Sequence, residues 1–226
     1  MLARQLDDLK LTASLLLTLA GGVSDRDEAR AQGLYDELLA FIEQHGEERF
    51  PTAFVNLADF ALRHGDYASA EHYSEQSVPL LRQEGDTWST ALALGNLGLA
   101  LLGLGKEAEA CERLAESMRL FESVGDRYGI AVSLSSLASV AADRGETGRA
   151  TRLLAQADHL LGEIEAEPAG VEKLLHEQTL ARVRAECKDF ESEWARGQAM
   201  TVEEAVAEAV GMSACTTSAD ASPNES

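Results

Sequence analysis

The chain has 226 residues, of which 45 % are hydrophobic, so it can bury a substantial core in one or two domains. Its formal net charge of −20 comes from 39 acidic and 19 basic residues spread along the whole chain. This charge opposes direct nucleic acid binding, which needs clustered lysine and arginine. A basic or apolar partner suits the chain better. Leucine and alanine dominate the apolar residues and aromatic residues make up only 5 %, so the composition predicts an all-α fold.

The cysteines and the apolar segment near the start indicate a cytoplasmic protein. Cys111, Cys187 and Cys215 form no CxxC pair and have no metal-ligand spacing, which argues against a disulfide framework and against a zinc site. The apolar segment 9–19 contains Lys10 and is too short to span a bilayer, so we interpret it as a buried helix. We expect no membrane segment and no bound cofactor.

A period of 40 residues organises the middle of the chain. The residues that coincide on this period are Gly65, Gly105 and Gly145; Leu57, Leu97 and Leu137; Ala70, Ala110 and Ala150; Leu80, Leu120 and Leu160; and Leu81, Phe121 and Leu161. A Gly-Asp pair at 85–86 and again at 125–126 adds a second mark on the same period. A repeat of this length is typical of stacked supersecondary units.

Each unit is predicted to be a helical hairpin. In the second unit, apolar and small residues follow helical spacing at Leu94, Leu97, Gly98 and Leu101, and then at Ala110, Leu114, Ser117, Leu120 and Phe121. Gly105 and Gly125 end the two helices, because glycine readily adopts the left-handed conformation of a helix C-terminus. Small residues at 58, 98 and 138, and at 70, 110 and 150, let the paired helices approach closely. Such hairpins must stack to bury their apolar faces, which gives an array with one concave surface.

These patterns divide the chain into four segments. We assign residues 1–46 to N-terminal helices that form a degenerate repeat with a turn near Gly21, and 47–167 to three helical hairpins. We assign 168–212 to C-terminal capping helices and 213–226 to a disordered tail. Pro79 is expected to kink or end the second helix of the first full hairpin. Thr201 and Glu204 form a predicted capping box that starts the last short helix.

Two further stretches carry a resemblance to a known family. Residues 149–154 read Arg-Ala-x-Arg-Leu-Leu, and a later segment contains Phe190, Trp194, Gly197, Met200, Thr201, Glu203, Glu204 and Ala205. With the Gly-Asp endings, these residues resemble the tetratricopeptide repeats at the C-terminal end of large bacterial signal-transduction ATPases and LuxR-type transcriptional regulators. The resemblance covers nearly all of residues 10–211. It implies a right-handed solenoid of helical hairpins with a C-terminal capping segment.

The resemblance also has limits and consequences for function. That family usually carries an ATPase domain and often a helix-turn-helix domain upstream, and neither is present, so their ATP and DNA chemistry is not carried over. The chain looks like the sensor region standing alone, either as a separate small protein or as a truncated reading frame. The family's concave groove would here be lined by Val55, Asp59, Leu62 and Arg63, by Leu99, Leu102 and Gly103, and by Ser135, Ser139 and Asp143. The alternative is a groove that packs against other parts of the chain itself.

No pattern in the sequence indicates catalysis. The segment that ends Gly103-Leu104-Gly105-Lys106 lacks the glycine and hydroxyl spacing of a phosphate-binding loop, so we interpret it as a helix end and a turn. The five histidines, at 45, 64, 72, 159 and 176, show no i, i+4 pairing and no HExxH motif, and we expect them at the surface. Cys111 is expected to pack within its helix pair. Trp88 is a candidate interface anchor, whereas Trp194 is expected to pack in the terminal cap.

We therefore expect a non-catalytic protein-interaction scaffold, related to the sensor arm of these transcriptional and signalling regulators, that holds a protein or peptide partner in its groove. Alternatively, the chain is a fragment of such a regulator that senses a small-molecule effector and lacks the regulator's ATPase and DNA-binding domains. An enzyme would need clustered titratable groups in the groove, which the sequence does not offer. Self-association of the chain is a further possibility.

Overall fold

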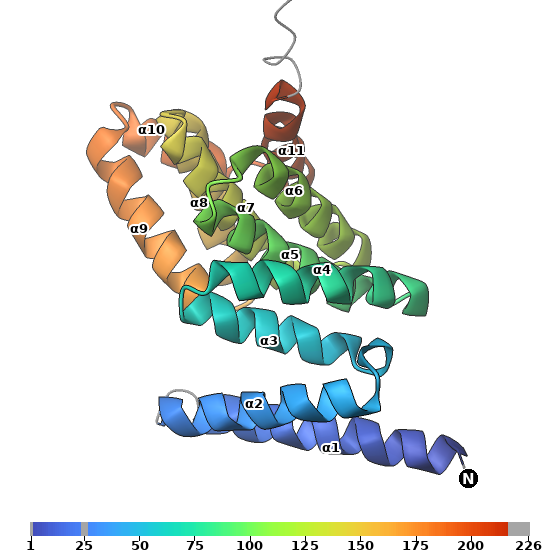
Figure 1. Cartoon of the computed structure of the whole chain (residues 1–226). Coiled ribbons are helices and arrows are strands. Elements are labelled where there is room, and N and C mark those ends of the chain that lie inside the picture. Colours follow the sequence, from blue (N-terminus) through green and yellow to red (C-terminus); the bar gives the residue numbers. More distant parts are fainter. Residues whose placement is uncertain (1, 24–26, 217–226) are drawn as a thin grey trace, which may run out of the picture.

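The computed structural model describes residues 2–23 and 27–216, with side chains over 8–23 and 27–211. Eleven α-helices, one 3-10 helix and no strand make up these parts of the chain, which confirms the predicted all-α fold (Figure 1). The helices are α1 (Leu2–Val23), α2 (Glu28–His45), η1 (Glu47–Arg49), α3 (Pro51–Arg63), α4 (Tyr67–Glu84), α5 (Thr87–Gly103), α6 (Glu107–Val124), α7 (Arg127–Asp143), α8 (Thr147–Glu163), α9 (Gly170–Glu186), α10 (Phe190–Gln198) and α11 (Val202–Thr216).

Consecutive helices pack as hairpins that stack into a solenoid. The pairs are α1 with α2, α3 with α4, α5 with α6, and α7 with α8 (Figure 1). The third hairpin stacks on the second through α4 and α5, and the fourth stacks on the third through α6 and α7. The last three helices leave this pattern, since α9 packs on α7 and α8, α10 packs on α8, and α11 packs mainly on α6 and α7. None of the helices in the described ranges is both long and apolar enough to cross a membrane.

The Gly-Asp pairs set the connections between hairpins. Gly85 has a φ of 72°, and it ends α4 in the left-handed conformation that glycine adopts without strain. The carboxylate of the next residue, Asp86, accepts a 3.0 Å hydrogen bond from the backbone N–H of Ser89 and so caps α5. The pair at 125–126 repeats this arrangement between α6 and α7. Two residues are therefore enough to end one helix and start the next.

Two expectations about helix ends need correction. Helix α4 continues through Pro79 to Glu84, and the proline lies on its exposed side, where water can satisfy the carbonyl that proline leaves without a partner. Helix α11 continues through residues 213–216, which the composition assigns to the tail, because this stretch contains no proline or glycine to stop it. Residues 217–226 lie outside the described residues.

Small residues hold the paired helices close together, as predicted. A Cβ atom built on Gly98 of α5 would lie only 2.6 Å from Cγ of Leu114 on α6, and the Leu114 side chain is 1 % exposed. The residues at the equivalent and facing positions are all completely buried alanines: Ala58, Ala70, Ala110, Ala138 and Ala150. Larger side chains at these positions would separate the helices.

Aromatic side chains instead join the first hairpin to the rest of the solenoid. Tyr35 of α2 packs on Phe60 of α3 with ring centroids 4.1 Å apart, and Phe41 packs near Phe50 at 5.7 Å. These large rings fill the space between α2 and α3. On α1 only one helix face is buried, through Ala13, Leu16 and Ala20, so the prediction of a buried helix holds for that face alone.

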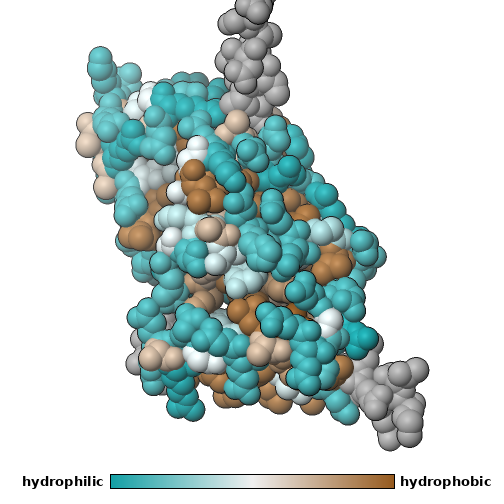
Figure 2. Space-filling model, viewed as in Figure 1, coloured by the Kyte–Doolittle hydropathy of each residue, from teal (hydrophilic) through white to brown (hydrophobic). Residues whose placement is uncertain are grey.

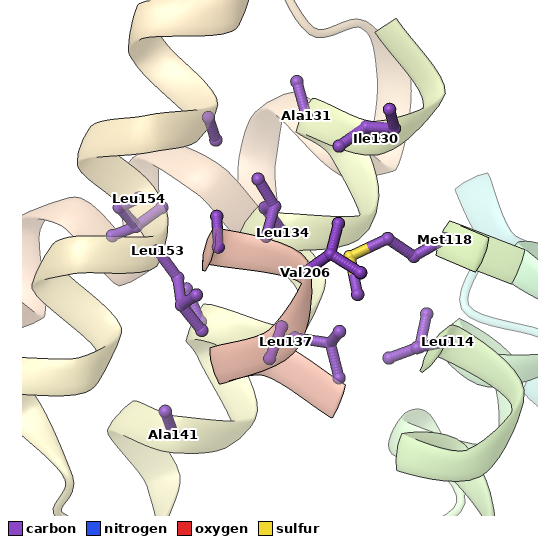
Figure 3. Packing of buried hydrophobic residues seen from close by; sticks show 14 of the residues in the cluster. Leu114, Met118, Ile130, Ala131, Leu134, Leu137, Ala141, Leu153, Leu154 and Val206 are labelled. Atoms are coloured by element: carbon purple, nitrogen blue, oxygen red, sulfur yellow. The ribbon is translucent and has the colours of Figure 1, made fainter. Parts of the chain in front are cut away.

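Helix α11 completes the main hydrophobic core. Its Val206 side chain points between Met118 of α6 and Leu137 of α7, and all three residues belong to one buried cluster (Figure 3). Ala205 and Ala209 of α11 are fully buried in the same cluster. The last helix is therefore part of the core of the second and third full hairpins.

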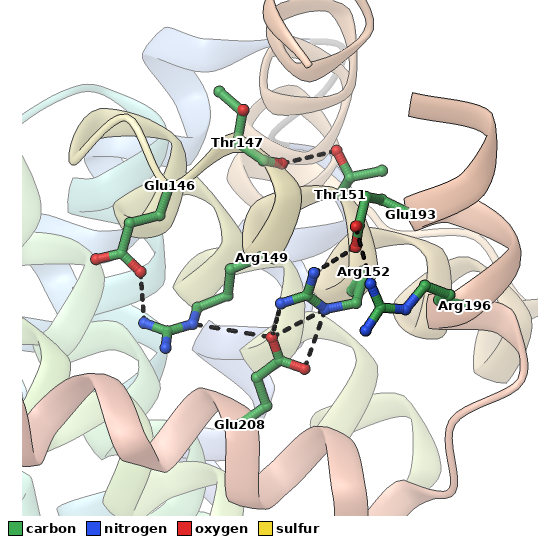
Figure 4. Close-up of polar contacts among 8 residues, drawn as sticks. All are labelled: Glu146, Thr147, Arg149, Thr151, Arg152, Glu193, Arg196 and Glu208. Atoms are coloured by element: carbon green, nitrogen blue, oxygen red, sulfur yellow. Dashed lines mark hydrogen bonds and ion pairs between the residues drawn. The ribbon is translucent and has the colours of Figure 1, made fainter. Parts of the chain in front are cut away.

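Arg152 of α8 ties α10 and α11 to the solenoid. Its guanidinium group pairs with Glu193 of α10 and with Glu208 of α11, where Nε lies 3.0 Å from Oε1 (Figure 4). These carboxylates raise the pKa of Arg152, and the Arg152 guanidinium in turn lowers the pKa of Glu193. We call Arg152, Glu193 and Glu208 the C-terminal clasp.

The two motif stretches of the sequence meet at this clasp. Arg152 belongs to the stretch 149–154, and Gly197 of the later segment lies so close to α8 that an added Cβ would be 2.7 Å from the Cα of Arg152. Trp194 stacks on Phe190 with ring centroids 5.3 Å apart and packs against the main core, as expected. The predicted capping box is present, because the N–H of Glu204 donates to Oγ1 of Thr201 at 3.2 Å and the N–H of Thr201 donates to the Glu204 carboxylate at 2.9 Å.

Candidate partner-binding site

The first helices of the three full hairpins, α3, α5 and α7, form one surface that we call the first-helix face. Helix α9 crosses this face, packing on α7 and α8 near its C-terminal end and reaching α3 at its N-terminal end (Figure 1). Val171 and Leu175 of α9 pack against a buried cluster that contains Leu62 of α3 and Leu99 of α5. The chain therefore covers part of its own first-helix face.

A buried histidine fastens α9 to this face. Nδ1 of His176 lies 2.9 Å from Oγ of Ser135 on α7, and Nε2 lies 2.9 Å from Oδ1 of Asp158 on α8. His176 is 6 % exposed and Ser135 is 3 % exposed, so no substrate can reach the hydroxyl, and the Ser-His-Asp sequence of contacts is structural. The expectation that every histidine lies at the surface is wrong for His176, because its partners come from other hairpins and cannot be read from local spacing.

We expect His176→Ala to lower the free energy of unfolding by about 1–3 kcal/mol, since it leaves the buried Ser135 hydroxyl and the Asp158 carboxylate without this partner. Urea unfolding followed by far-ultraviolet circular dichroism measures the change. His159→Ala is the matched control, because His159 is on α8 with a side chain that is 44 % exposed, and its loss should cost less than about 0.5 kcal/mol. Equal effects of the two substitutions would contradict the role of His176.

Most residues of the expected groove lie under or beside α9. Leu62 and Leu99 are buried near Val171 and Leu175, Leu102 is partly buried in the same region, and Ser135 and Ser139 are buried on α7. Charged members of the groove make ion pairs at its edge: Arg63 Nη2 lies 2.6 Å from Asp59 Oδ2, and Asp143 pairs with Arg182 of α9. The structure thus brings these eight residues to one region, and α9 occupies that region.

Two residues of the expected groove face elsewhere. Val55 is buried among Val78, Leu81, Ala93 and Leu94, and its carbonyl accepts a 3.0 Å hydrogen bond from Nδ2 of Asn96. Gly103 lies against the ring of Tyr67 on α4, so close that a Cβ atom at this position would collide with the ring. Both residues lie in the contact between the hairpin α3–α4 and the hairpin α5–α6.

The part of the first-helix face that α9 leaves open contains a cavity of about 270 Å³. We call it the first-helix cavity. Its lining from α5 and α7 includes Trp88, Leu92, Asn96, Leu99, Tyr128, Val132 and Ser136, and α9 contributes Glu172. The indole of Trp88 is 50 % exposed, and its Nε1 donates a 2.7 Å hydrogen bond to Oδ2 of Asp126, another lining residue. The large apolar ring of Trp88 thus lies at the cavity, and its indole nitrogen already has a hydrogen-bond partner.

Acidic groups supply the charge of this cavity. Asp126 and Glu172 are among its lining residues, whereas no lysine, arginine or histidine is among the described side chains that line it. Burial raises the pKa of the Glu172 carboxyl, with a further rise from Asp59 and an opposing effect from Arg63. Burial also raises the pKa of the Tyr128 hydroxyl. The cavity therefore suits an apolar group, especially one that carries a positive charge beside it.

Sequence reasoning found Trp88 but not the cavity around it. Trp88 and five lining residues that sequence reasoning missed form three pairs on the 40-residue period: Trp88 with Tyr128, Leu92 with Val132, and Asn96 with Ser136. The aromatic pair at equivalent positions of two first helices is a signal in the sequence that indicates a shared apolar surface. Glu172 has no such signal, because α9 lies outside the repeat.

The geometry defines a solenoid of helical hairpins whose first-helix face is partly covered by its own helix α9. The family model for the tetratricopeptide repeat matches residues 49–110 and 89–157, which extend from η1 into α8. Residues 49–157 are therefore a tetratricopeptide repeat region, and repeats of this kind generally mediate protein–protein interactions. A comparison with curated proteins gives no match.

Proposed function

We propose that this chain is a non-catalytic interaction module that binds a polypeptide segment of a partner protein on the open part of its first-helix face. The observation that supports this proposal most strongly is the first-helix cavity, with the half-exposed Trp88 beside it. Exposed aromatic side chains next to an apolar pocket are typical anchors of protein interfaces. An apolar side chain of the partner would enter the cavity.

The charges around the cavity limit the chemistry of the partner. Asp126 and Glu172 lie at the cavity, and the whole chain has a net charge of −20. A basic residue next to the apolar anchor would complement these carboxylates and would also increase the association rate at low ionic strength. The partner segment is therefore apolar and basic, and it is short, because α9 occupies the rest of the face.

We further propose that the module acts in transcriptional regulation or signalling in the cytoplasm. The basis is the resemblance to the C-terminal region of LuxR-type and ATPase-type regulators, together with the contact between the two motif stretches at the C-terminal clasp. Because its surface is acidic, the module binds protein, and any nucleic acid is bound by other chains.

A small-molecule effector is the second candidate ligand. Residues of four helices, α5, α6, α7 and α9, line the first-helix cavity. Its volume of about 270 Å³ is just below the usual range of small-molecule sites, roughly 300–1,000 Å³. Such an effector would be compact, largely apolar and neutral or cationic, for the same reasons as the anchor of a polypeptide.

The test compares the wild-type chain with a Trp88→Ala, Val132→Glu variant in affinity capture from cytoplasmic extract, followed by titration calorimetry with the captured partner. We expect at least about a tenfold loss of affinity, because the anchor is removed and a charge enters the cavity. Val124→Glu is the matched control: Val124 is 45 % exposed at the end of α6 and does not line the cavity, so its binding should stay unchanged.

The outcomes separate the two candidates. Loss of one captured protein by the cavity variant alone supports the polypeptide proposal. Capture that is equal for all three chains contradicts it. If instead a low-molecular-mass fraction of the extract raises the melting temperature of wild type and not of the cavity variant, the effector is the better account.

A further inference from the structure

A row of leucines on α1 faces solvent. Leu11, Leu15 and Leu19 are 59 %, 55 % and 53 % exposed, and their i, i+4, i+8 spacing places them on one side of the helix. Hydrophobic atoms are visible along the lower edge of the molecule, where α1 lies (Figure 2). We call these three residues the outer leucine stripe. Three large apolar side chains in one row on the surface indicate an interaction surface.

Helix α5 shows how the equivalent helix face is covered within the solenoid. The buried residues Ala13, Leu16 and Ala20 of α1 match Leu94, Leu97 and Leu101 of α5, and by the same alignment the stripe matches Leu92, Asn96 and Ala100. In α5 these positions contact the preceding hairpin. Asn96 donates to the Val55 carbonyl, Leu92 packs against a cluster that includes Val55, and Ala100 packs with Leu62. The stripe therefore matches the positions of α5 that contact the preceding hairpin.

The charge pattern of α1 indicates which kind of partner covers the outer leucine stripe. Residues 11–23 contain no charged side chain, although the chain as a whole has a net charge of −20. Two copies with this charge repel each other over most of their surface, and an uncharged apolar face is where that repulsion is weakest. A basic partner would gain nothing from such a face. A membrane-binding helix would be expected to carry an excess of lysine or arginine beside its leucines. The charged residues that precede Leu11 show no such excess: they are Arg4, Asp7, Asp8 and Lys10.

We propose that the outer leucine stripe is a self-association surface, on which α1 of a second copy packs across a two-fold axis to form a dimer. A two-fold axis lets one row of leucines pack on an identical row, so a single surface serves both copies. The two solenoids then continue each other end to end. The first-helix cavity has no lining residue from α1, so this proposal does not depend on the proposed function.

Sedimentation velocity of the full chain over a range of concentrations tests the dimer. We expect wild type to shift from the 24.3 kDa monomer to twice that mass at roughly micromolar concentration. The Leu11→Glu, Leu15→Glu variant should dimerise at least about 100-fold more weakly, with unchanged circular dichroism, because it places two carboxylates in the contact. Added salt should strengthen the wild-type dimer by screening the repulsion between two acidic chains.

Leu174→Glu is the matched control, since Leu174 on α9 is 56 % exposed and lies outside the stripe. It should dimerise like wild type. A wild-type chain that remains monomeric at all concentrations overturns the proposal, and so does a stripe variant that dimerises as well as wild type. Binding of monomeric wild type, and not of the stripe variant, to phosphatidylcholine vesicles would assign the stripe to a lipid surface and overturn it as well.

Discussion

Replacing Gly197 with alanine should lower the free energy of unfolding by about 2–3 kcal/mol. A Cβ atom at this position in α10 would lie 2.7 Å from the Cβ of Ala155 and 2.7 Å from the Cα of Arg152, both on α8. These atoms belong to or adjoin the backbone of a buried helix, so they cannot rotate away. Alanine favours helix over glycine by about 1 kcal/mol, but the collision outweighs this gain by forcing α10 away from α8.

Guanidinium chloride unfolding of wild type and variants measures the effect. Gly162→Ala is the matched control, because Gly162 is also within a helix and an added Cβ there meets nothing within 4 Å. This control should be neutral or should gain up to about 1 kcal/mol. If Gly197→Ala were as stable as Gly162→Ala, the close contact between α8 and α10 would be disproved.

The second large effect is expected at the C-terminal clasp. Arg152→Met should cost about 2–3 kcal/mol, because it leaves the carboxylates of Glu193 and Glu208 without their shared cation in a partly buried setting. Methionine retains the apolar stem, so the loss reports on the charge. Arg149→Met removes a neighbouring arginine whose Nε is 3.8 Å from the Glu208 carboxylate, and we expect it to cost less than about 1 kcal/mol.

The clasp also predicts a pH dependence. Arg152 holds the pKa of Glu193 below its ordinary value in the folded chain. Folding therefore favours the ionised form, so the stabilisation is complete above the ordinary glutamate pKa of about 4.3 and is lost as the pH falls through the lowered value. The free energy of unfolding of wild type should consequently decrease more steeply below about pH 4.3 than that of Arg152→Met. Parallel pH profiles would contradict this linkage.

The repeated part of the fold could be predicted from the sequence because its determinants are local. Gly85 and Asp86 end one helix and start the next through contacts within four residues of themselves, and Gly98 faces Leu114 in the same hairpin. Interactions of this kind recur at a fixed spacing, so the period reveals them. The capping box at Thr201 and Glu204 was predictable for the same reason.

The candidate site could be predicted only in part, because contacts between distant segments decide which surface stays open. The residues expected to line the groove belong to α3, α5 and α7. Nothing in the sequence near Ser135 shows that His176, 41 positions later, covers it. The sequence leaves open whether the groove packs against other parts of the chain, and α9 packs against several of these residues. Glu172 also lines the cavity only because α9 packs on helices that are distant from it in the sequence.

Helix α9 has a mechanical consequence. A solenoid in which each hairpin touches only its neighbours behaves as a spring, and it can stretch or lose one unit at a time. Here α9 contacts α7 and α8 at one end and α3 at the other. It therefore bridges the three full hairpins and opposes their separation. Pulling on α3 loads α8 directly. Under tension, the three full hairpins should therefore unfold together in one step. The hairpin of α1 and α2, which α9 does not bridge, should detach first.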